Sequence, residues 1–205
     1  MQIELRVMEL LISRLCHDLI SPAGAIVNGI ELVEDFGGDD MADEAMALVG
    51  RSARQLSAKL SLFRVAFGSA GERDNYPAEE CRRLLDAYLQ EGKVRLDWAL
   101  DRLPAAPGSA RLLLLLAMIA AESLPRGGLL HIDGGPAAFR LVAQGDDTRL
   151  ETAAEEALDA GMAGSGVPTE LDARAVPAYL AGMLAARRGD RVRVTKETGA
   201  ITLIV

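Results

Sequence analysis

The residues best suited to chemistry are a neighbouring histidine and aspartate, His17 and Asp18. A neutral imidazole nitrogen is a nucleophile, and an adjacent carboxylate could hold the ring or take its proton, which keeps one nitrogen free for attack. If the ring is exposed, a flat partner surface could bring a phosphoryl group in line with that nitrogen. An exposed histidine is also a common surface residue, so these residue types leave both interpretations open.

The apolar residues around His17 predict that it lies on a long helix and faces water. They recur at alternating spacings of four and three, which indicates the seam of a helix in a coiled-coil-like bundle. Pro22 is expected to kink this helix without ending it. In this register His17 points away from the seam, among small and polar residues. The seam comprises Met8, Ile12, Leu15, Leu19, Pro22, Ile26, Gly29 and Val33, and the neighbours of His17 are Ser13, Arg14, Ser21, Gly24 and Asn28, with Leu10 and Ile20 at the margin.

A second helix is predicted to return along the first. Gly37, Gly38 and Asp39 form the expected turn, and Asp39 or Asp40 is the expected N-cap. Such a hairpin cannot bury both faces of its seams alone, so it must pair with another copy or with the rest of the chain. Dimerisation into a four-helix bundle is the simplest solution. The inward residues of the second helix are expected to be Ala45, Val49, Ser52, Leu56, Leu60, Phe63 and Phe67.

Residues 68–77, GSAGERDNYP, collect turn-forming residues and mark a predicted boundary between a domain at 1–70 and a second domain at 71–205. Downstream, helical patterns and alternating strand patterns are mixed in order, which predicts an α+β layer with helices on one face of a sheet. A Gly-rich loop is expected at residues 161–166. The predicted helices cover residues 78–90, 111–124, 152–160 and 172–188, and the predicted strands cover 94–100, 129–133, 139–143, 192–195 and 201–205.

Composition argues against several classes of partner. A net charge of -8 and a pI near 4.9 argue against nucleic acid, which is normally bound by a basic surface. Charged residues interrupt the N-terminal segment, so neither a secretory signal nor a membrane-spanning run is expected. Cys16 and Cys81 are too few for a disulfide framework or a zinc site, which makes a reducing cytoplasm the expected compartment.

The segment LCHDLISP at residues 15–22 resembles the H-box of sensor histidine kinases, and HDLISPAGAIVNGIELVED resembles the alphaproteobacterial histidine phosphotransferases of the ChpT type. The later segment AVPAYLAGMLAARRGDRVRV fits the last helix and hairpin of that family. The resemblance implies that His17 is phosphorylated, that Asp18 is its acid/base neighbour and that Ser21 takes part in phosphate chemistry. Ser21 could instead bond its own helix backbone and Asn28 could be a solvated amide. Arg14 could pair with phosphate or with an acidic pocket of the partner, or only solubilise the helix.

The second domain resembles the ATP-binding module of the same kinases in a degenerate form. Leu115 and Ile119 stand where that module carries Asn residues for magnesium, so the metal would have no ligand there. The strand FRLVAQGDD lacks the Asp-x-Gly-x-Gly motif, and only Gly182 stands where a paired-Gly turn is expected. We therefore expect no bound ATP, metal or other cofactor, and a scaffolding and docking role for this domain. His131 has no second metal-ligand partner in the sequence and is interpreted as structural.

The resemblance implies a phosphoryl relay between aspartates of receiver domains, from a hybrid histidine kinase to response regulators, through a phosphohistidine at His17. The receiver is expected to bring the magnesium ion, because this chain has no carboxylate cluster beside the histidine. Two alternatives remain at this point. One is a dimeric adaptor that binds receivers without being phosphorylated, and the other, less favoured, is an ATP-dependent histidine autokinase.

Overall fold

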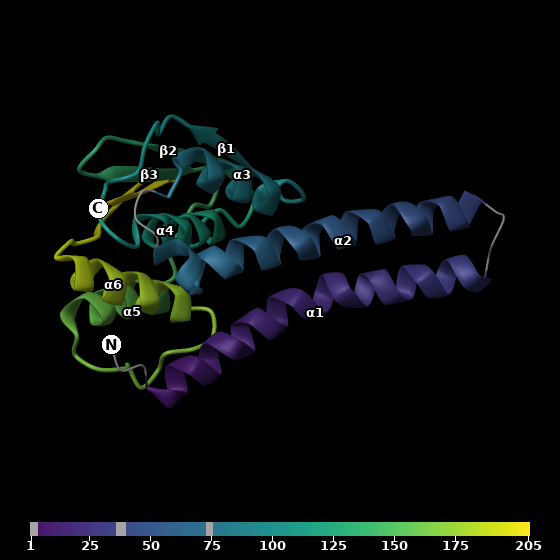
Figure 1. Ribbon diagram of the computed structural model, residues 1–205, viewed down its shortest axis with the longest axis horizontal. Helices are drawn as coiled ribbons and strands as arrows, with labels where there is room; N and C mark the ends of the chain where they lie inside the picture. Colours follow the sequence, from purple (N-terminus) through teal and green to yellow (C-terminus); the bar gives the residue numbers. More distant parts are fainter. Residues whose placement is uncertain (1–3, 36–39, 73–75) are drawn as a thin grey trace.

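The N-terminal third of the chain folds into two long helices. The computed structural model describes residues 4–35, 40–72 and 76–205. Helix α1 (Leu5–Asp35) and helix α2 (Asp40–Ala66) form a hairpin that extends away from a mixed α/β part (Figure 1). The predicted turn at residues 37–39 lies outside the described residues. The division into domains at residues 70 and 71 stays a prediction.

Helix α1 continues through Pro22, as expected, and Figure 1 shows that it changes direction near its middle. From residue 15 onward the predicted seam is buried or half-buried against α2. Gly29 allows the closest approach, because a Cβ atom built there would lie 2.6 Å from a methyl carbon of Val49. The two helices therefore pack through the predicted seam over the outer part of the hairpin.

Three predicted seam positions near the α/β part are not buried between α1 and α2 in the single chain. Met8, Ile12 and Leu60 are 47%, 57% and 49% exposed in the single chain. The buried residue at this end of α1 is instead Val7, which is 1% exposed and belongs to the main core. Here the helix turns a different flank inward, because it packs on the α/β part as well as on α2.

The α/β part contains one mixed five-stranded sheet in the order β1-β2-β3-β5-β4. The first two strands are parallel, joined by a crossover through a helix, and all other neighbours are antiparallel. This sheet confirms the predicted α+β class and the predicted C-terminal hairpin. The strands are β1 (Val94–Trp98), β2 (Gly128–Gly134), β3 (Phe139–Gln144), β4 (Arg193–Glu197) and β5 (Ala200–Ile204).

Helix α4 is the centre of the core. Every residue from 112 to 120 is buried, because the helix lies between one face of the sheet and helices α2, α3 and α6. A helix that is apolar on all sides needs this enclosure. The elements outside the sheet are η1 (Ser69–Glu72), α3 (Ala78–Leu89), α4 (Ser109–Glu122), α5 (Thr152–Ala163) and α6 (Val176–Arg188).

Helix α5 is longer than predicted, because Gly161 belongs to the helix and not to the expected loop. Gly161 and Gly182 let α5 and α6 touch backbone to backbone. A Cβ atom at Gly161 would lie 2.3 Å from the carbonyl oxygen of Tyr179, and one at Gly182 would lie 2.2 Å from that of Leu158. Gly182, which stands where the resemblance expects a paired-Gly turn, thus has a packing role here.

Helix α6 begins at Val176, later than the predicted start at residue 172. The carboxylate of Asp172 accepts hydrogen bonds from the backbone N–H groups of Arg174 and Ala175, at 2.9 and 2.8 Å. These are the bonds that an N-cap side chain makes to the N–H groups two and three residues ahead, and the carbonyl oxygen of Asp172 also accepts a hydrogen bond of 3.2 Å from the N–H of Val176. Asp172 therefore caps the turn that leads into α6.

Among the described residues, α1 is long and apolar enough to cross a membrane by length and composition alone, since an 18-residue window has a mean hydropathy of 1.3. The prediction that the N-terminal segment does not span a membrane stays a prediction, because helices of soluble proteins pass the same test of length and composition. Only 11% of the window is buried in the single chain. Arg14 and Asp18 lie within the helix and would each be costly in a bilayer. Packing in a helical bundle accounts for the apolar character of α1 without placing these two charges in a bilayer.

His131 joins two strands on the sheet face opposite the helices. Its Nδ1 lies 2.7 Å from Oδ2 of Asp97 on β1, and its Nε2 lies 2.9 Å from Oδ2 of Asp133, which also pairs with Arg140 on β3. Partial burial lowers the pKa of His131, but the hydrogen bonds and charges of both aspartates outweigh it and raise that pKa. These contacts agree with the structural role interpreted for this histidine.

A raised pKa makes the stability of this sheet depend on pH. Protonated His131 stabilises the fold below its ordinary pKa of about 6.5, and this contribution is lost as pH rises through the folded-state value. Wild type should therefore lose about 0.5 kcal/mol more free energy of unfolding between about pH 6 and about pH 8 than His131→Gln. Urea unfolding at both pH values measures the difference, and equal losses in the two proteins would contradict the assignment.

Candidate functional site

His17 projects from the middle of α1 with its side chain 80% exposed. Its Nδ1 lies 3.1 Å from Oδ1 of Asp18. Within the described part of the chain, Nε2 makes no hydrogen bond. If Asp18 accepts the proton of Nδ1, the ring presents an unprotonated Nε2 to solvent, an assignment that follows from the hydrogen-bond network. The predicted exposed imidazole is confirmed in its position.

Asp18 is held on both of its carboxylate oxygens. Oδ1 faces the ring of His17, and Oδ2 accepts a hydrogen bond of 2.7 Å from Nε of Arg14, one turn earlier on the helix. The Asp18 side chain is only 14% exposed, so little water competes for these contacts. A carboxylate fixed in this way can orient the imidazole and stabilise positive charge that develops on it.

Arg14 was predicted on the exposed surface beside His17, and that placement is wrong. The residue is 8% exposed, and its guanidinium pairs with Asp18 and with Glu122 at the end of α4. Burial lowers the pKa of Arg14, but the two carboxylates reverse this effect and raise it. Arg14 therefore remains charged and is engaged within the chain, instead of being free to meet a phosphate.

Pro22 removes one backbone hydrogen bond from α1 close to the histidine. Proline has no N–H, so the carbonyl oxygen of Asp18, four residues earlier, loses its helical donor. Nζ of Lys59 on α2 donates a hydrogen bond of 2.9 Å to this oxygen. The lysine therefore fastens α2 to α1 at the level of His17. Sequence reasoning missed Lys59, although the proline rule identifies the carbonyl that needs a partner.

The remaining predicted site residues lie on α1 and are exposed. Ser13, Ser21 and Asn28 are exposed, and Ile20 is 69% exposed. Gly24 is also exposed, and a Cβ atom built there would find nothing within 4 Å. These residues leave open space along one flank of α1, so a partner surface can approach the imidazole without displacing large side chains.

The positions where a nucleotide module would carry polar side chains are filled with apolar ones. Leu115 is 1% exposed and Ile119 is 5% exposed, and both belong to the main core. Among residues 4–35, 40–72 and 76–205, no group of three or more His, Cys, Asp or Glu residues could hold a metal ion. Leu115 and Ile119 thus offer no oxygen to a phosphate or a cation.

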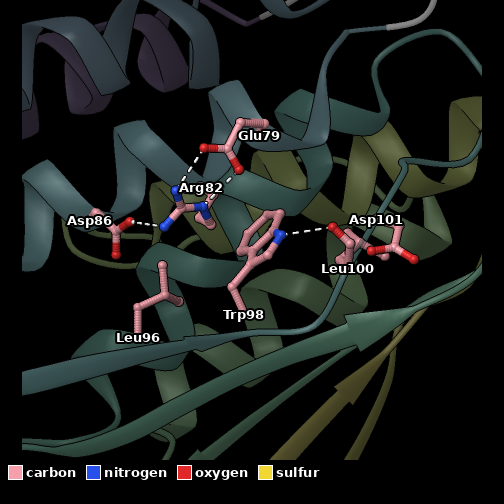
Figure 2. Close-up of a pocket in the computed structure, with 7 residues that line it drawn as sticks. All are labelled: Glu79, Arg82, Asp86, Leu96, Trp98, Leu100 and Asp101. Carbon is pink, nitrogen blue, oxygen red and sulfur yellow. Dashed lines mark hydrogen bonds and ion pairs between the residues drawn. The ribbon is translucent and has the colours of Figure 1, made fainter.

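An open hollow of about 440 Å³ lies between α3 and β1. Figure 2 shows Arg82 held between Glu79 and Asp86, and the indole of Trp98 donating to the carbonyl oxygen of Leu100 at 2.7 Å. Its polar groups are largely occupied by one another, and none of its lining residues comes from α1 or α2. The hollow is therefore separate from the histidine and does not form part of the candidate site.

Comparison with known proteins links these features to a family. The model of the histidine phosphotransferase C-terminal domain matches residues 78–200. The chain is 35% identical over 192 residues to the protein phosphotransferase ChpT of Brucella abortus (strain 2308), which covers 90% of this chain and 88% of that protein. This chain belongs to the ChpT family of histidine phosphotransferases. The family suggested by residues 17–35 is thereby confirmed.

The fold is shared with a solved member of the same functional class. A structure described as a bacterial phosphotransferase aligns with a TM-score of 0.82 and 30% identity, over 100% of this chain and 97% of the other. The similarity extends through both the helical hairpin and the α/β part. Phosphotransfer is therefore the activity to which the geometry around His17 has to be related.

The bond between Lys59 and Asp18 predicts a coupling with Pro22. Lys59→Met should lower the free energy of unfolding by about 1–2 kcal/mol, because it leaves a partly buried carbonyl without a donor. In a Pro22→Ala background an N–H is available for that carbonyl, so the same change should cost much less. A double-mutant cycle by urea unfolding measures this coupling.

The exposed Arg51 on the same helix gives the matched control, as Arg51→Met removes a cation from α2 at a position facing solvent. Its cost should be small and unaffected by Pro22→Ala. Additive effects of Lys59→Met and Pro22→Ala would show that Lys59 does not replace the missing N–H.

Proposed function

We propose that this chain relays a phosphoryl group between aspartates of receiver domains, taking it from a hybrid histidine kinase and passing it to response regulators through a phosphohistidine on His17. The observation that carries the proposal is the geometry of one ring. His17 is 80% exposed, and among the described residues its one polar contact is that of Nδ1 with Asp18 at 3.1 Å. Family membership and the named relative support phosphotransfer as the reaction class.

The chemical step exchanges an acyl phosphate for a phosphoramidate. Nε2 of His17 attacks the phosphorus atom of a phosphoaspartate on the receiver, an N–P bond forms, and the P–O bond to the receiver's aspartate breaks. The carboxylate leaves with the electron pair of that bond. The proton on Nδ1 stays between the ring and Asp18, whose charge stabilises the positive imidazole ring. Transfer to the next receiver is the reverse reaction.

The flank of α1 around the histidine suits a docking partner. Ser13, Ser21, Gly24 and Asn28 are small or polar and exposed, while Ile20 supplies one large apolar contact. A close fit at this surface would exclude water and align the phosphoryl group with Nε2. Ser21 lies one turn beyond His17, where its hydroxyl could contact the phosphate.

The receiver supplies the metal ion in this mechanism. Phosphoryl transfer needs cationic stabilisation of the equatorial oxygens, and magnesium is the usual source. Asp18, the carboxylate adjacent to His17, is already engaged by the ring and by Arg14. A receiver that brings its own magnesium would complete the site, so no cofactor needs to reside on this chain.

The C-terminal domain serves as a scaffold and docking surface and does not bind ATP. Leu115 and Ile119 are enclosed in the core, where a nucleotide-binding relative of this fold would need metal-binding polar groups. Gly182 packs against α5, so its lack of a side chain is used for helix contact. A degenerate ATPase-like origin of this domain agrees with both features.

A second copy of the chain covers the remaining apolar flank of the hairpin. Single exposed apolar residues are normal, but these recur along both helices. Pairing two hairpins into a four-helix bundle would bury them, and a dimer working in the cytoplasm is the simplest form of the relay. The exposed residues include Leu5, Met8, Ile12, Val27 and Ile30 on α1 and Met41, Met46 and Leu60 on α2.

The relay predicts a specific pattern of labelling. A receiver domain carrying ³²P-phosphoaspartate should transfer label to the wild-type chain, and His17→Ala should accept none, because Nε2 is the acceptor atom. Addition of a second, unphosphorylated receiver should remove the label from the chain. Autoradiography after rapid mixing and gel electrophoresis measures all three steps.

The same experiment separates the alternatives. Label that arrives from [γ-³²P]ATP and magnesium without a receiver would indicate an autokinase. Receiver binding by wild type with no label on the chain would indicate an adaptor. His131→Ala is the control, because it removes the other histidine without touching α1, and it should accept label as wild type does.

The dimer predicts that a charge on the apolar flank separates the two chains. Ile30→Glu should convert a species of twice the 21.8 kDa chain mass into a monomer, because a buried carboxylate without a partner is strongly unfavourable. Light scattering coupled to size-exclusion chromatography measures the mass. Asn28→Glu places the same charge on the histidine side of α1 and should remain dimeric. Equal masses for wild type and both variants would contradict the proposed interface.

A further inference from the structure

Glu122 connects the α/β part to the helix that carries the histidine. It is the last residue of α4, the central helix of the core, and its Oε1 accepts a hydrogen bond from a terminal nitrogen of Arg14 on α1. Because α4 is buried on all sides, its end is a rigid point from which to hold a side chain on another element. The contact therefore fixes the guanidinium of Arg14 against the core.

Arg14 passes this constraint on to the site. Its Nε donates to Oδ2 of Asp18 at 2.7 Å, while the other carboxylate oxygen of Asp18 lies 3.1 Å from Nδ1 of His17. The three side chains between the core and the imidazole are thus joined by consecutive polar contacts. Tyr88 of α3 is buried close to the same groups. Its burial and the negative charge of Glu122 both raise its pKa.

The geometry of a guanidinium explains why Glu122 matters for the ring. Arginine presents its N–H donors as a planar fork, which favours two parallel hydrogen bonds to a single carboxylate. In the structure, Glu122 occupies one terminal nitrogen, and Arg14 uses Nε alone on Asp18. Without Glu122, the freed donors would draw the second oxygen of Asp18 toward Arg14. The ring of His17 would then lose its partner on Nδ1.

We propose that Glu122 is a positioning residue for His17, acting through Arg14 and Asp18 to keep Nδ1 engaged and Nε2 directed at the partner. This inference rests on the proposed function in one respect, namely that Nε2 accepts the phosphoryl group. It gives the C-terminal domain a part in the reaction, because the end of α4 supplies the carboxylate that, through Arg14 and Asp18, sets the orientation of the nucleophile.

A purely structural ion pair between the two parts of the chain is the competing explanation, and α1 offers a matched control for it. Arg6 also holds α1 to the C-terminal part, through hydrogen bonds to the backbone carbonyl oxygens of Thr169 and Leu171. Arg6→Ala weakens the attachment of α1 without touching the contacts that lead to His17. A general effect of loosened attachment should therefore be seen in Arg6→Ala as well as in Glu122→Gln.

The test combines a readout of the ring with a readout of reactivity. Imidazole ¹⁵N shifts of His17, followed against pH, report its tautomer and its pKa. Initial rates of phosphorylation are measured from a phosphorylated receiver and from phosphoramidate, a small donor that needs no docking surface. The proteins compared are wild type, Glu122→Gln, Glu122→Asp and Arg6→Ala, each checked for native circular dichroism.

Glu122→Gln should reduce the population with the proton on Nδ1 and lower the rate roughly tenfold with both donors, as expected for a misplaced nucleophile. Glu122→Asp keeps the charge and should restore part of the tautomer population and part of the rate. It also provides the test of Glu122 if Glu122→Gln is poorly folded. Arg6→Ala should match wild type in tautomer and in the phosphoramidate rate.

An unchanged tautomer and rate in Glu122→Gln would overturn the inference, as would equal changes in Arg6→Ala. A wild-type chain that no receiver labels would overturn the proposed relay instead. The comparison of tautomers would still decide the role of Glu122, because it needs no phosphoryl transfer.

Discussion

The site depends on one buried guanidinium. Arg14 is enclosed at the junction of α1, α3 and α4, where an unpaired charge would be strongly destabilising, and it is satisfied by Asp18 on one side and by Glu122 on the other. Either carboxylate alone would leave some N–H donors of the Arg14 guanidinium without an acceptor. The need to pair this cation therefore fixes the position of α1 relative to the core. Because Asp18 contacts the ring of His17, the orientation of that ring is fixed as well.

Pro22 and Lys59 connect the residue beside His17 to the second helix of the hairpin. Pro22 removes one hydrogen bond from α1, and Lys59 of α2 takes the place of the missing donor at the carbonyl oxygen of Asp18. The residue beside His17 is thus fixed through its backbone by α2 and through its side chain by Arg14. Support from two directions allows a very exposed side chain to keep a defined orientation.

Local patterns in the sequence were sufficient for most elements and for the exposure of His17, but not for contacts made across the fold. Heptad spacing describes only the packing of helix on helix, so Arg14 was placed in water. The α/β part covers one flank of α1, and Arg14 is buried there. Gly161 reads as a loop residue until its contact with α6 is known. Glu122 gave no signal at all, because its partner lies on a helix far away in the sequence.

The apolar filling of α4 limits what this fold can become. A cation site of oxygen ligands needs several side chains at once, yet each polar replacement at Leu115 or Ile119 would first place an unpaired amide in a closed core, at a cost of about 2 kcal/mol or more. Each such step weakens the fold before enough oxygen ligands are in place to hold an ion. The close packing of α4 therefore opposes the stepwise introduction of an oxygen-ligand cation site at Leu115 and Ile119.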